Sequence, residues 1–214
     1  CEAYRVLCEG ADMVEIGMPY SDPFLDGPVI QHATTRALAR GVRTRDAFTA
    51  AETVASCGKT PVVMTYWNLI EQYGPDAFAR DLAAAGGAGV ITPDLTPDEA
   101  DEWIAATDAH GLDRIFLIAP SSTSERIAMT MAACRGWVYA TSVMGVTGVR
   151  RGTSLAAPVI AARAREIDPD LPVGIGLGVG NGDQAAEVGA YADAVIVGSA
   201  LVRCLASDGA DMPG

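Results

Sequence analysis

The sequence predicts an α/β fold built on a parallel sheet, and its simplest form is a (β/α)8 TIM barrel. Short apolar runs of strand length recur seven times, and Ala-rich segments with helical spacing lie between them. The runs are continuously apolar, not alternating, which is typical of strands buried on both faces of a parallel sheet. A regular alternation of strands and helices also indicates parallel pairing.

Each expected strand is short. The strands cover residues 13–18, 61–66, 89–92, 114–119, 137–140, 173–176 and 194–197. Glycines and prolines mark turns along the whole chain, and no linker or low-complexity tract divides it. We therefore expect a single domain that covers residues 1–214.

The expected helices alternate with these strands. They cover residues 2–10, 76–85, 97–110, 124–134, 155–166, 183–189 and 199–205. Thr96 stands where a side chain could cap the helix at 97–110. The first helix runs directly into the first strand, and the last helix is short. Seven units predict either a barrel without its first strand and last long helix, or an open doubly wound sheet.

Composition excludes several function classes. The net charge of −12 disfavours nucleic acid and anionic membranes as partners, because both need clustered Lys and Arg. No apolar run reaches the roughly 20 residues of a membrane span. Five scattered cysteines without CxxC spacing favour reduced thiols and a cytoplasmic protein. With only His32 and His110, a His-rich metal site is excluded, and both are expected to be structural.

Two acids near the N-terminus carry the first functional signal. Glu15 lies inside an apolar run, and Asp26 lies in a following loop that is rich in Pro and Gly. Burying a carboxylate costs several kcal/mol unless the charge is paired or the group takes up a proton. Two acids in contrasting environments can divide general-acid and general-base duty. Alternatively, Glu15 pairs with a buried base and Asp26 caps a turn.

A glycine-rich segment near the C-terminus indicates a phosphate site. Residues 173–183 read VGIGLGVGNGD, and no register has the glycine offsets of a dinucleotide fingerprint. IVGSALV follows at 196–202, and MGVTG lies earlier, at 144–148. Glycine-rich loops after the last strands, with the N-terminus of a short helix, form the usual phosphate site of (β/α)8 barrels. The segment therefore favours the barrel over the doubly wound sheet, although such glycines can also simply form tight turns.

At this point the sequence resembles a family, the bacterial tryptophan synthase alpha subunits. The matching segments cover nearly the whole chain in order, and the SDPxxDGP loop is highly specific. They are VEIGMPYSDPFLDGP (14–28), VVMTYWN (62–68), ITPDLTPDEA (91–100), APSST (119–123), SVMGVTG (142–148), GIGLGVG (174–180) and VIVGSALV (195–202). The resemblance implies a single (β/α)8 barrel that cleaves indole-3-glycerol phosphate to indole and glyceraldehyde 3-phosphate. Relative to the family, we expect the first strand and the last long helix to be missing.

The resemblance also assigns roles to individual residues. Glu15 matches the general acid/base, and Asp26 matches the loop aspartate that engages the indole N–H. Tyr66 and Tyr139 match aromatic residues of the substrate pocket, and Thr147 matches the threonine of a mobile loop that closes over the substrate. The phosphate-binding positions of the family are matched by Gly148, Gly178, Gly198 and Ser199. Asp22 and Asp94 match residues on the side that meets the beta subunit.

The family works as an alpha2beta2 heterotetramer with a beta subunit, which holds pyridoxal phosphate and receives the indole. No cofactor or metal is therefore expected in this chain. Retro-aldol cleavage without a metal or a Schiff-base lysine needs proton transfer at two places. The only lysine, Lys59, precedes a strand, which disfavours a Schiff base at a strand end. The alternatives are another phosphosugar-binding barrel, such as an isomerase or epimerase, and a non-catalytic activator of a beta subunit.

Overall fold

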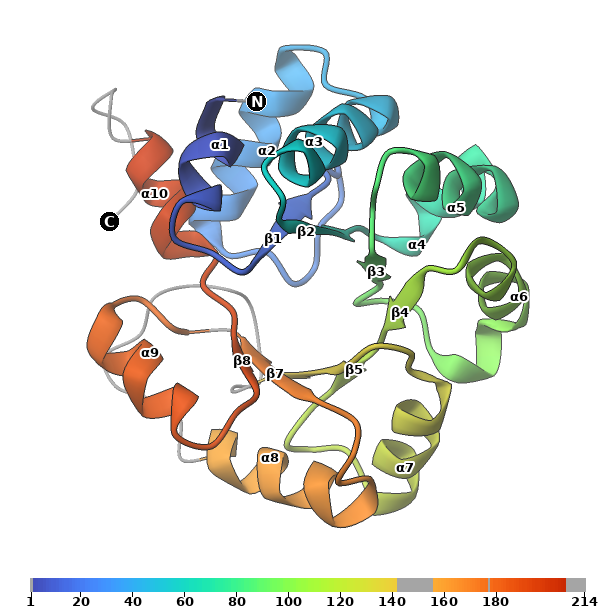
Figure 1. Cartoon of the computed structure of the whole chain (residues 1–214), viewed down its shortest axis with the longest axis vertical. Helices are drawn as coiled ribbons and strands as arrows, with labels where there is room; N and C mark the ends of the chain where they lie inside the picture. Colours follow the sequence, from blue (N-terminus) through green and yellow to red (C-terminus); the bar gives the residue numbers. More distant parts are fainter. Residues whose placement is uncertain (1, 142–155, 177, 207–214) are drawn as a thin grey trace.

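The chain forms a ring of parallel strands surrounded by helices (Figure 1). The computed structural model describes residues 2–141, 156–176 and 178–206. The described strands form two four-stranded parallel sheets, ordered β1-β2-β3-β4 and β5-β6-β7-β8. Their bounds are β1 Met13–Gly17, β2 Thr60–Met64, β3 Gly89–Ile91, β4 Asp113–Ile115, β5 Leu117–Ile118, β6 Val138–Thr141, β7 Val173–Gly176 and β8 Ala194–Val195.

One predicted strand is interrupted in the structure. The single run expected at 114–119 is divided into β4 and β5, which lie on either side of Phe116. β4 pairs with β3, whereas β5 pairs with β6, so the chain changes its partner strand at this residue. The carbonyl of Phe116 accepts a hydrogen bond from the Tyr139 N–H at 3.1 Å. β4 and β5 are therefore one passage of the chain, and the seven predicted strand positions are all present.

The helices lie outside the strands, and three of them were not assigned from the sequence. α2 buries only Val29, whereas α3 has a buried face at helical spacing that includes Phe48, Ala51 and Val54. α4 is the third. The helices are α1 Glu2–Cys8, α2 Pro28–Ala39, α3 Thr44–Ser56, α4 Trp67–Tyr73, α5 Pro75–Ala84, α6 Asp101–His110, α7 Ser124–Ala133, α8 Ala156–Ile167, α9 Gly182–Gly189 and α10 Ser199–Ala206.

The helix predicted over 97–110 begins later than expected. Pro97–Glu99 is a single 3-10 turn, η1, and α6 starts at Asp101. Thr96 has an extended backbone at the N-cap of this turn, but its side chain makes no capping hydrogen bond, so that part of the prediction was wrong. Thr123 and Asn181 do cap α7 and α9: their side-chain oxygens accept backbone N–H bonds at 3.2 and 2.9 Å.

The apolar core has two layers. One layer lies between the strands and the helices. It contains Val14, Ile16 and Phe78 in one half of the barrel, and Ile160 and Ile175 in the other half. The other lies inside the ring, where buried Val62, Ile91, Ile115 and Tyr139 meet. Helices cover only the outer faces of the strands, as in a barrel (Figure 1). The alternative of an open doubly wound sheet, which carries helices on both faces, is therefore wrong.

Candidate active site

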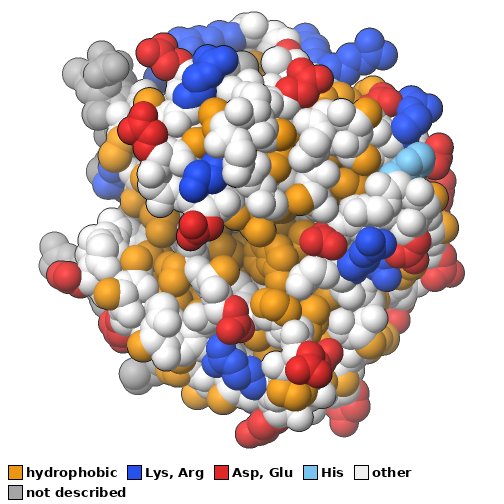
Figure 2. Space-filling model, in the orientation of Figure 1, with side chains coloured by type: hydrophobic (Ala, Val, Ile, Leu, Met, Phe, Trp, Pro, Cys, Tyr) orange, Lys and Arg blue, Asp and Glu red, His pale blue; other side chains and the backbone are white. Residues whose placement is uncertain are grey.

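Strand β1 directs Glu15 toward the inside of the barrel. Its neighbours Val14 and Ile16 are almost fully buried in the layer beneath the helices. Because side chains alternate along a strand, Glu15 points to the opposite face. Its register partner on β2 is Val62, a member of the interior apolar cluster. Figure 2 shows hydrophobic side chains lining the hollowed centre of the molecule, with acidic residues around it.

This environment tunes the acidity of Glu15. Burial raises the pKa of its carboxyl to about 7, and the negative charge of Asp26 contributes to the same shift. A carboxyl with a pKa near 7 can both donate and accept a proton at neutral pH, which is what general acid/base catalysis requires. Glu15 and Asp26 are therefore close enough for the charge of one acid to affect the other.

Asp26 is held by the loop between β1 and α2. The Tyr66 hydroxyl donates a hydrogen bond to Oδ1 of Asp26 at 3.4 Å, and the Leu25 N–H donates to the Tyr66 hydroxyl at 3.2 Å. The Gln31 side-chain amide donates to the carbonyl of Asp26 at 2.7 Å. Burial raises the pKa of Asp26, while the hydrogen bond from Tyr66 opposes that rise. These contacts fix the position of the carboxylate near the barrel mouth.

Tyr66 is the anchor of this loop. It is 5% exposed and stands at the N-cap of α4, two residues after the end of β2. Its ring packs against those of Tyr20 and Phe24, with centroid distances of 4.9 and 5.4 Å. Burial raises the pKa of Tyr66 to about 12, so its hydroxyl stays protonated and remains a donor at neutral pH.

Tyr139 lies inside the barrel close to Glu15. It is 3% exposed on β6, and both burial and the charge of Glu15 raise the pKa of its phenol well above 10. Its hydroxyl lies where a side chain of Gly176 would begin, so the bare backbone of β7 provides the space for the ring. Trp137 stacks against it, with ring centroids 5.9 Å apart. Tyr139 therefore forms part of the wall around the Glu15 carboxyl.

Three of the predicted phosphate-binding residues lie after the last two strands. Gly178 follows β7 with a φ of 108°, a left-handed backbone that favours glycine. Gly198 and Ser199 follow β8, where α10 begins. Since β7 and β8 pair in parallel, their carboxyl ends are adjacent. Backbone N–H groups at such adjacent strand ends are what a phosphate site requires. Thr147 and Gly148 lie outside the described residues.

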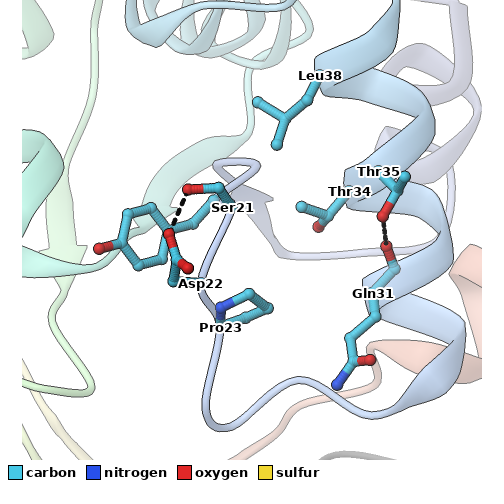
Figure 3. A pocket seen from close by; sticks show the side chains of 8 residues that line it. Ser21, Asp22, Pro23, Gln31, Thr34, Thr35 and Leu38 are labelled. Carbon is cyan, nitrogen blue, oxygen red and sulfur yellow. Dashed lines mark hydrogen bonds between the residues drawn. The ribbon is translucent and has the colours of Figure 1, made fainter.

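The two acids predicted at the partner-facing side lie on separate loops. Asp22 is exposed and accepts a hydrogen bond from the Ser21 hydroxyl at 2.6 Å. It borders a pocket of about 450 Å³ between the β1–α2 loop and α2, which is shown in Figure 3. Asp94 accepts the Trp67 N–H at 2.9 and 3.0 Å, and burial raises the pKa of its carboxyl. Because Trp67 follows Tyr66, one dipeptide contacts both loops.

Sequence reasoning missed the apolar residues that line the interior beside Glu15. Met64 and Leu117 are partly buried there, against the cluster that contains Ile91 and Tyr139. The available signal was strand alternation: Met64 lies two residues after Val62, so both face inward. This surface suits a flat aromatic group.

The described residues contain no group of three or more His, Cys, Asp or Glu side chains that could hold a metal ion. Lys59 precedes β2, at the end of the strand opposite to Tyr66, so its amine lies away from Glu15 and Asp26. In the same described ranges, no helix is both long and apolar enough to cross a membrane.

Comparison with known proteins settles the family. The family model described as tryptophan synthase alpha chain matches residues 2–212. This chain belongs to that family. The tryptophan synthase alpha chain of Mycobacterium ulcerans (strain Agy99) is 65% identical over 196 residues, covering 92% of this chain and 72% of the relative. That of Acidothermus cellulolyticus is 62% identical over 204 residues, covering 95% and 76%.

Solved structures agree with this assignment. A structure of Mycobacterium tuberculosis tryptophan synthase has a TM-score of 0.92 and 57% identity, covering 96% of this chain and 79% of that chain. A chain from the tryptophan synthase alpha2beta2 complex of Pyrococcus furiosus has a TM-score of 0.87 and 32% identity, covering 97% and 85%. The predicted family, barrel fold and carbon–carbon lyase activity are confirmed, and the isomerase or epimerase alternative is not favoured.

Proposed function

We propose that this tryptophan synthase alpha chain cleaves indole-3-glycerol phosphate through Glu15 and Asp26. The observation that supports this most is Glu15 itself: a carboxyl with a pKa of about 7, inside an apolar barrel and next to a second acid. Glu15 protonates the indole carbon that carries the side chain. It then takes up the proton of the adjacent glycerol hydroxyl as the carbon–carbon bond breaks. The products are indole and glyceraldehyde 3-phosphate.

Asp26 acts on the other side of the indole. Its carboxylate accepts the indole N–H and stabilises the positive charge that develops on the ring after protonation. Tyr66 keeps this carboxylate in place through its hydroxyl. Met64, Leu117 and Tyr139 provide the apolar wall for the ring. Thr147 closes over the bound substrate, and loop closure of this kind excludes water from the reaction.

The phosphate of the substrate binds at the carboxyl ends of β7 and β8. Gly178, Gly198 and Ser199 offer backbone N–H groups there, together with Gly148 from the loop after β6. Glycine at these positions allows the anion to approach the backbone closely. Because the chain carries a net charge of −12, such local donors must hold the phosphate against an unfavourable overall field.

The partner of this chain is the beta subunit of a cytoplasmic tryptophan synthase alpha2beta2 complex. Pyridoxal phosphate belongs to that beta subunit, which consumes the indole. Asp22 and Asp94 lie on the side that meets it. The hydrogen bonds of the adjacent residues Tyr66 and Trp67 support this placement. Tyr66 bonds Asp26, which is in the same loop as Asp22, and Trp67 bonds Asp94.

The decisive experiment measures indole release from indole-3-glycerol phosphate with a beta subunit present. We expect Glu15→Gln to lower the rate by about 100-fold or more, since general acid/base groups contribute 10²–10⁴-fold. Glu166→Gln, at an exposed position on α8, is the matched control and should keep full activity. If the wild-type chain releases no indole but still stimulates the beta subunit, the chain is a non-catalytic activator and the proposed lyase function is wrong.

A second assay tests the partner-facing side. Asp22→Asn should weaken stimulation of the beta subunit while the isolated chain still cleaves its substrate. Asp12→Asn, at an exposed position just before β1, serves as control. Equal stimulation by both variants would remove Asp22 from the interface.

A further inference from the structure

Two cysteines lie together at the amino-end edge of the barrel, away from the proposed active site. Cys8 is the last residue of α1, and Cys57 directly follows α3. These helices contact each other and lead into β1 and β2, whose first residues, Met13 and Thr60, are register partners. The ends of both helices are therefore brought to the same edge. There Cys57 is near enough to contribute to the raised pKa of the Cys8 thiol.

The two thiols differ in their access to solvent. Cys8 is 6% exposed and belongs to the core cluster, whereas Cys57 is exposed. Burial raises the pKa of the Cys8 thiol, the neighbouring Cys57 raises it further, and the positive charge of Lys59 opposes this rise. A dissolved oxidant therefore reaches Cys57 first, and Cys8 is placed to attack the product. Exposed sulfur beside a second thiol is the usual arrangement of a redox-sensitive pair.

The backbone around the pair has room to adjust. Cys57 is followed by Gly58, which has a φ of 73° and nothing within 4 Å of the position of an added Cβ. Cys8 is followed by a turn in which the Gly10 N–H bonds the Leu7 carbonyl at 3.1 Å. Both cysteines thus lie at the ends of helices, where small shifts do not disturb a helix interior. A disulfide needs its two Cα atoms within about 7 Å.

We propose that Cys8 and Cys57, which are free thiols in the structure, form a reversible disulfide when the protein meets a peroxide. The Cys57 thiol gives up its proton and its sulfur attacks one peroxide oxygen; the O–O bond breaks, Cys57 becomes a sulfenic acid, and the hydroxide takes up that proton and leaves as water. The Cys8 thiol then gives up its proton as its sulfur attacks the Cys57 sulfur; the S–O bond breaks, and the hydroxide leaves with that proton as a second water. In total, two thiols are oxidised and one hydrogen peroxide is reduced.

The bond would close a loop that contains the proposed catalytic acids. The segment from Cys8 to Cys57 includes β1, the β1–α2 loop, α2 and α3, and so carries Glu15 and Asp26. Cross-linking this segment restrains the unfolded chain and stabilises the fold. The inference does not rest on the proposed function, because the pair is remote from the carboxyl ends of the strands.

The test treats the reduced full-length protein with hydrogen peroxide, blocks remaining thiols under denaturing conditions, and maps the peptides by mass spectrometry. We expect a linked Cys8–Cys57 peptide pair, two hydrogens lighter than the separate peptides, which reducing agent separates again. The melting temperature of the oxidised protein should rise by about 5 °C. Cys204→Ser, which removes an exposed thiol on α10, should still form the link.

The single variants distinguish this pairing from other oxidation. In Cys57→Ser, we expect Cys8 to remain reduced and available to the blocking reagent after denaturation. In Cys8→Ser, Cys57 should accumulate sulfenic and sulfinic acid, because its resolving thiol is gone. Three results would overturn the proposal: sulfinic acid at Cys57 of the wild type without a link, a link to a different cysteine, or a bond between Cys57 and Lys59. Indole release should persist in the oxidised protein, which keeps this test separate from that of the lyase.

Discussion

The hydroxyl of Tyr66 lies 3.4 Å from Oδ1 of Asp26 and donates a hydrogen bond to it. The Tyr66 hydroxyl oxygen also accepts a hydrogen bond from the Leu25 N–H at 3.2 Å. One buried phenol therefore holds both the Asp26 carboxylate and its loop. The next residue, Trp67, donates its N–H to Asp94. Two consecutive residues after β2 thus connect the loop of the proposed catalytic acid with the loop of Asp94, on the proposed partner-facing side.

Tyr66→Phe tests this connection. The substitution keeps the ring stack with Tyr20 and Phe24 but removes the donor to Asp26. A hydrogen bond to a charged group contributes about 1.5–3 kcal/mol, so we expect kcat/KM to fall by roughly 10–100-fold. The pKa of Asp26 should also rise, because the bond from Tyr66 lowers it. The acidic limb of the pH–rate profile should then move to higher pH.

Tyr20→Phe is the control for this substitution, since it removes a hydroxyl from the neighbouring ring. Unchanged kcat/KM and an unmoved acidic limb in Tyr66→Phe would show that the hydroxyl does not position Asp26.

The pH dependence of cleavage follows from the two acids. In the proposed reaction Glu15 starts protonated, so kcat/KM should fall as pH rises through about 7, the pKa of Glu15. Asp26 must be ionised, so the rate should also fall at low pH, where its raised pKa places the second limb. The profile of indole release should therefore be bell-shaped. A rate that keeps rising above pH 7 would mean that ionised Glu15 is the reactive form.

Glu15→Gln also has a consequence for stability. The folded pKa of Glu15 is about 7, above its ordinary value of 4.5. The folded state therefore favours the protonated form, and stability is lost as pH rises from about 4.5 through 7. The penalty above pH 7 is at most about 3 kcal/mol, from 1.36 kcal/mol per pKa unit. We expect Glu15→Gln to be more stable than the wild type at pH 8 and similar to it at pH 4.5.

Urea unfolding at the two pH values measures this difference, and Glu166→Gln provides the exposed control. A Glu15→Gln variant that is less stable than the wild type at pH 8 would indicate that the ionised carboxyl has a stabilising partner.

Much of the architecture was predictable because apolar runs report burial directly. The runs at 13–18 and 173–176 became β1 and β7 nearly unchanged, and a charged residue within the first run identified Glu15. The exchange of partner strands at Phe116 was not predictable, since it depends on pairing with β3 on one side and β6 on the other.

The site was predictable in composition but not in its contacts. Motifs indicated Tyr66 and Tyr139 as pocket residues, yet nothing local in the sequence links the Tyr66 hydroxyl to Asp26, 40 positions away. Likewise, the space that Gly176 leaves for Tyr139 arises only when β6 and β7 pair side by side. Both relations are tertiary, and neither follows from local periodicity.

Gly176→Ala tests the packing of Tyr139 beside Glu15. An added Cβ would collide with the Tyr139 hydroxyl and ring, so the phenol must move toward the interior. Overpacking of a buried site typically costs about 1–3 kcal/mol. Because Tyr139 adjoins Glu15, we expect lower thermal stability and a shifted basic limb in the pH–rate profile. Gly182→Ala, with nothing within 4 Å of its Cβ, is the matched control. Loss of stability without any change of that limb would make Tyr139 a packing residue alone.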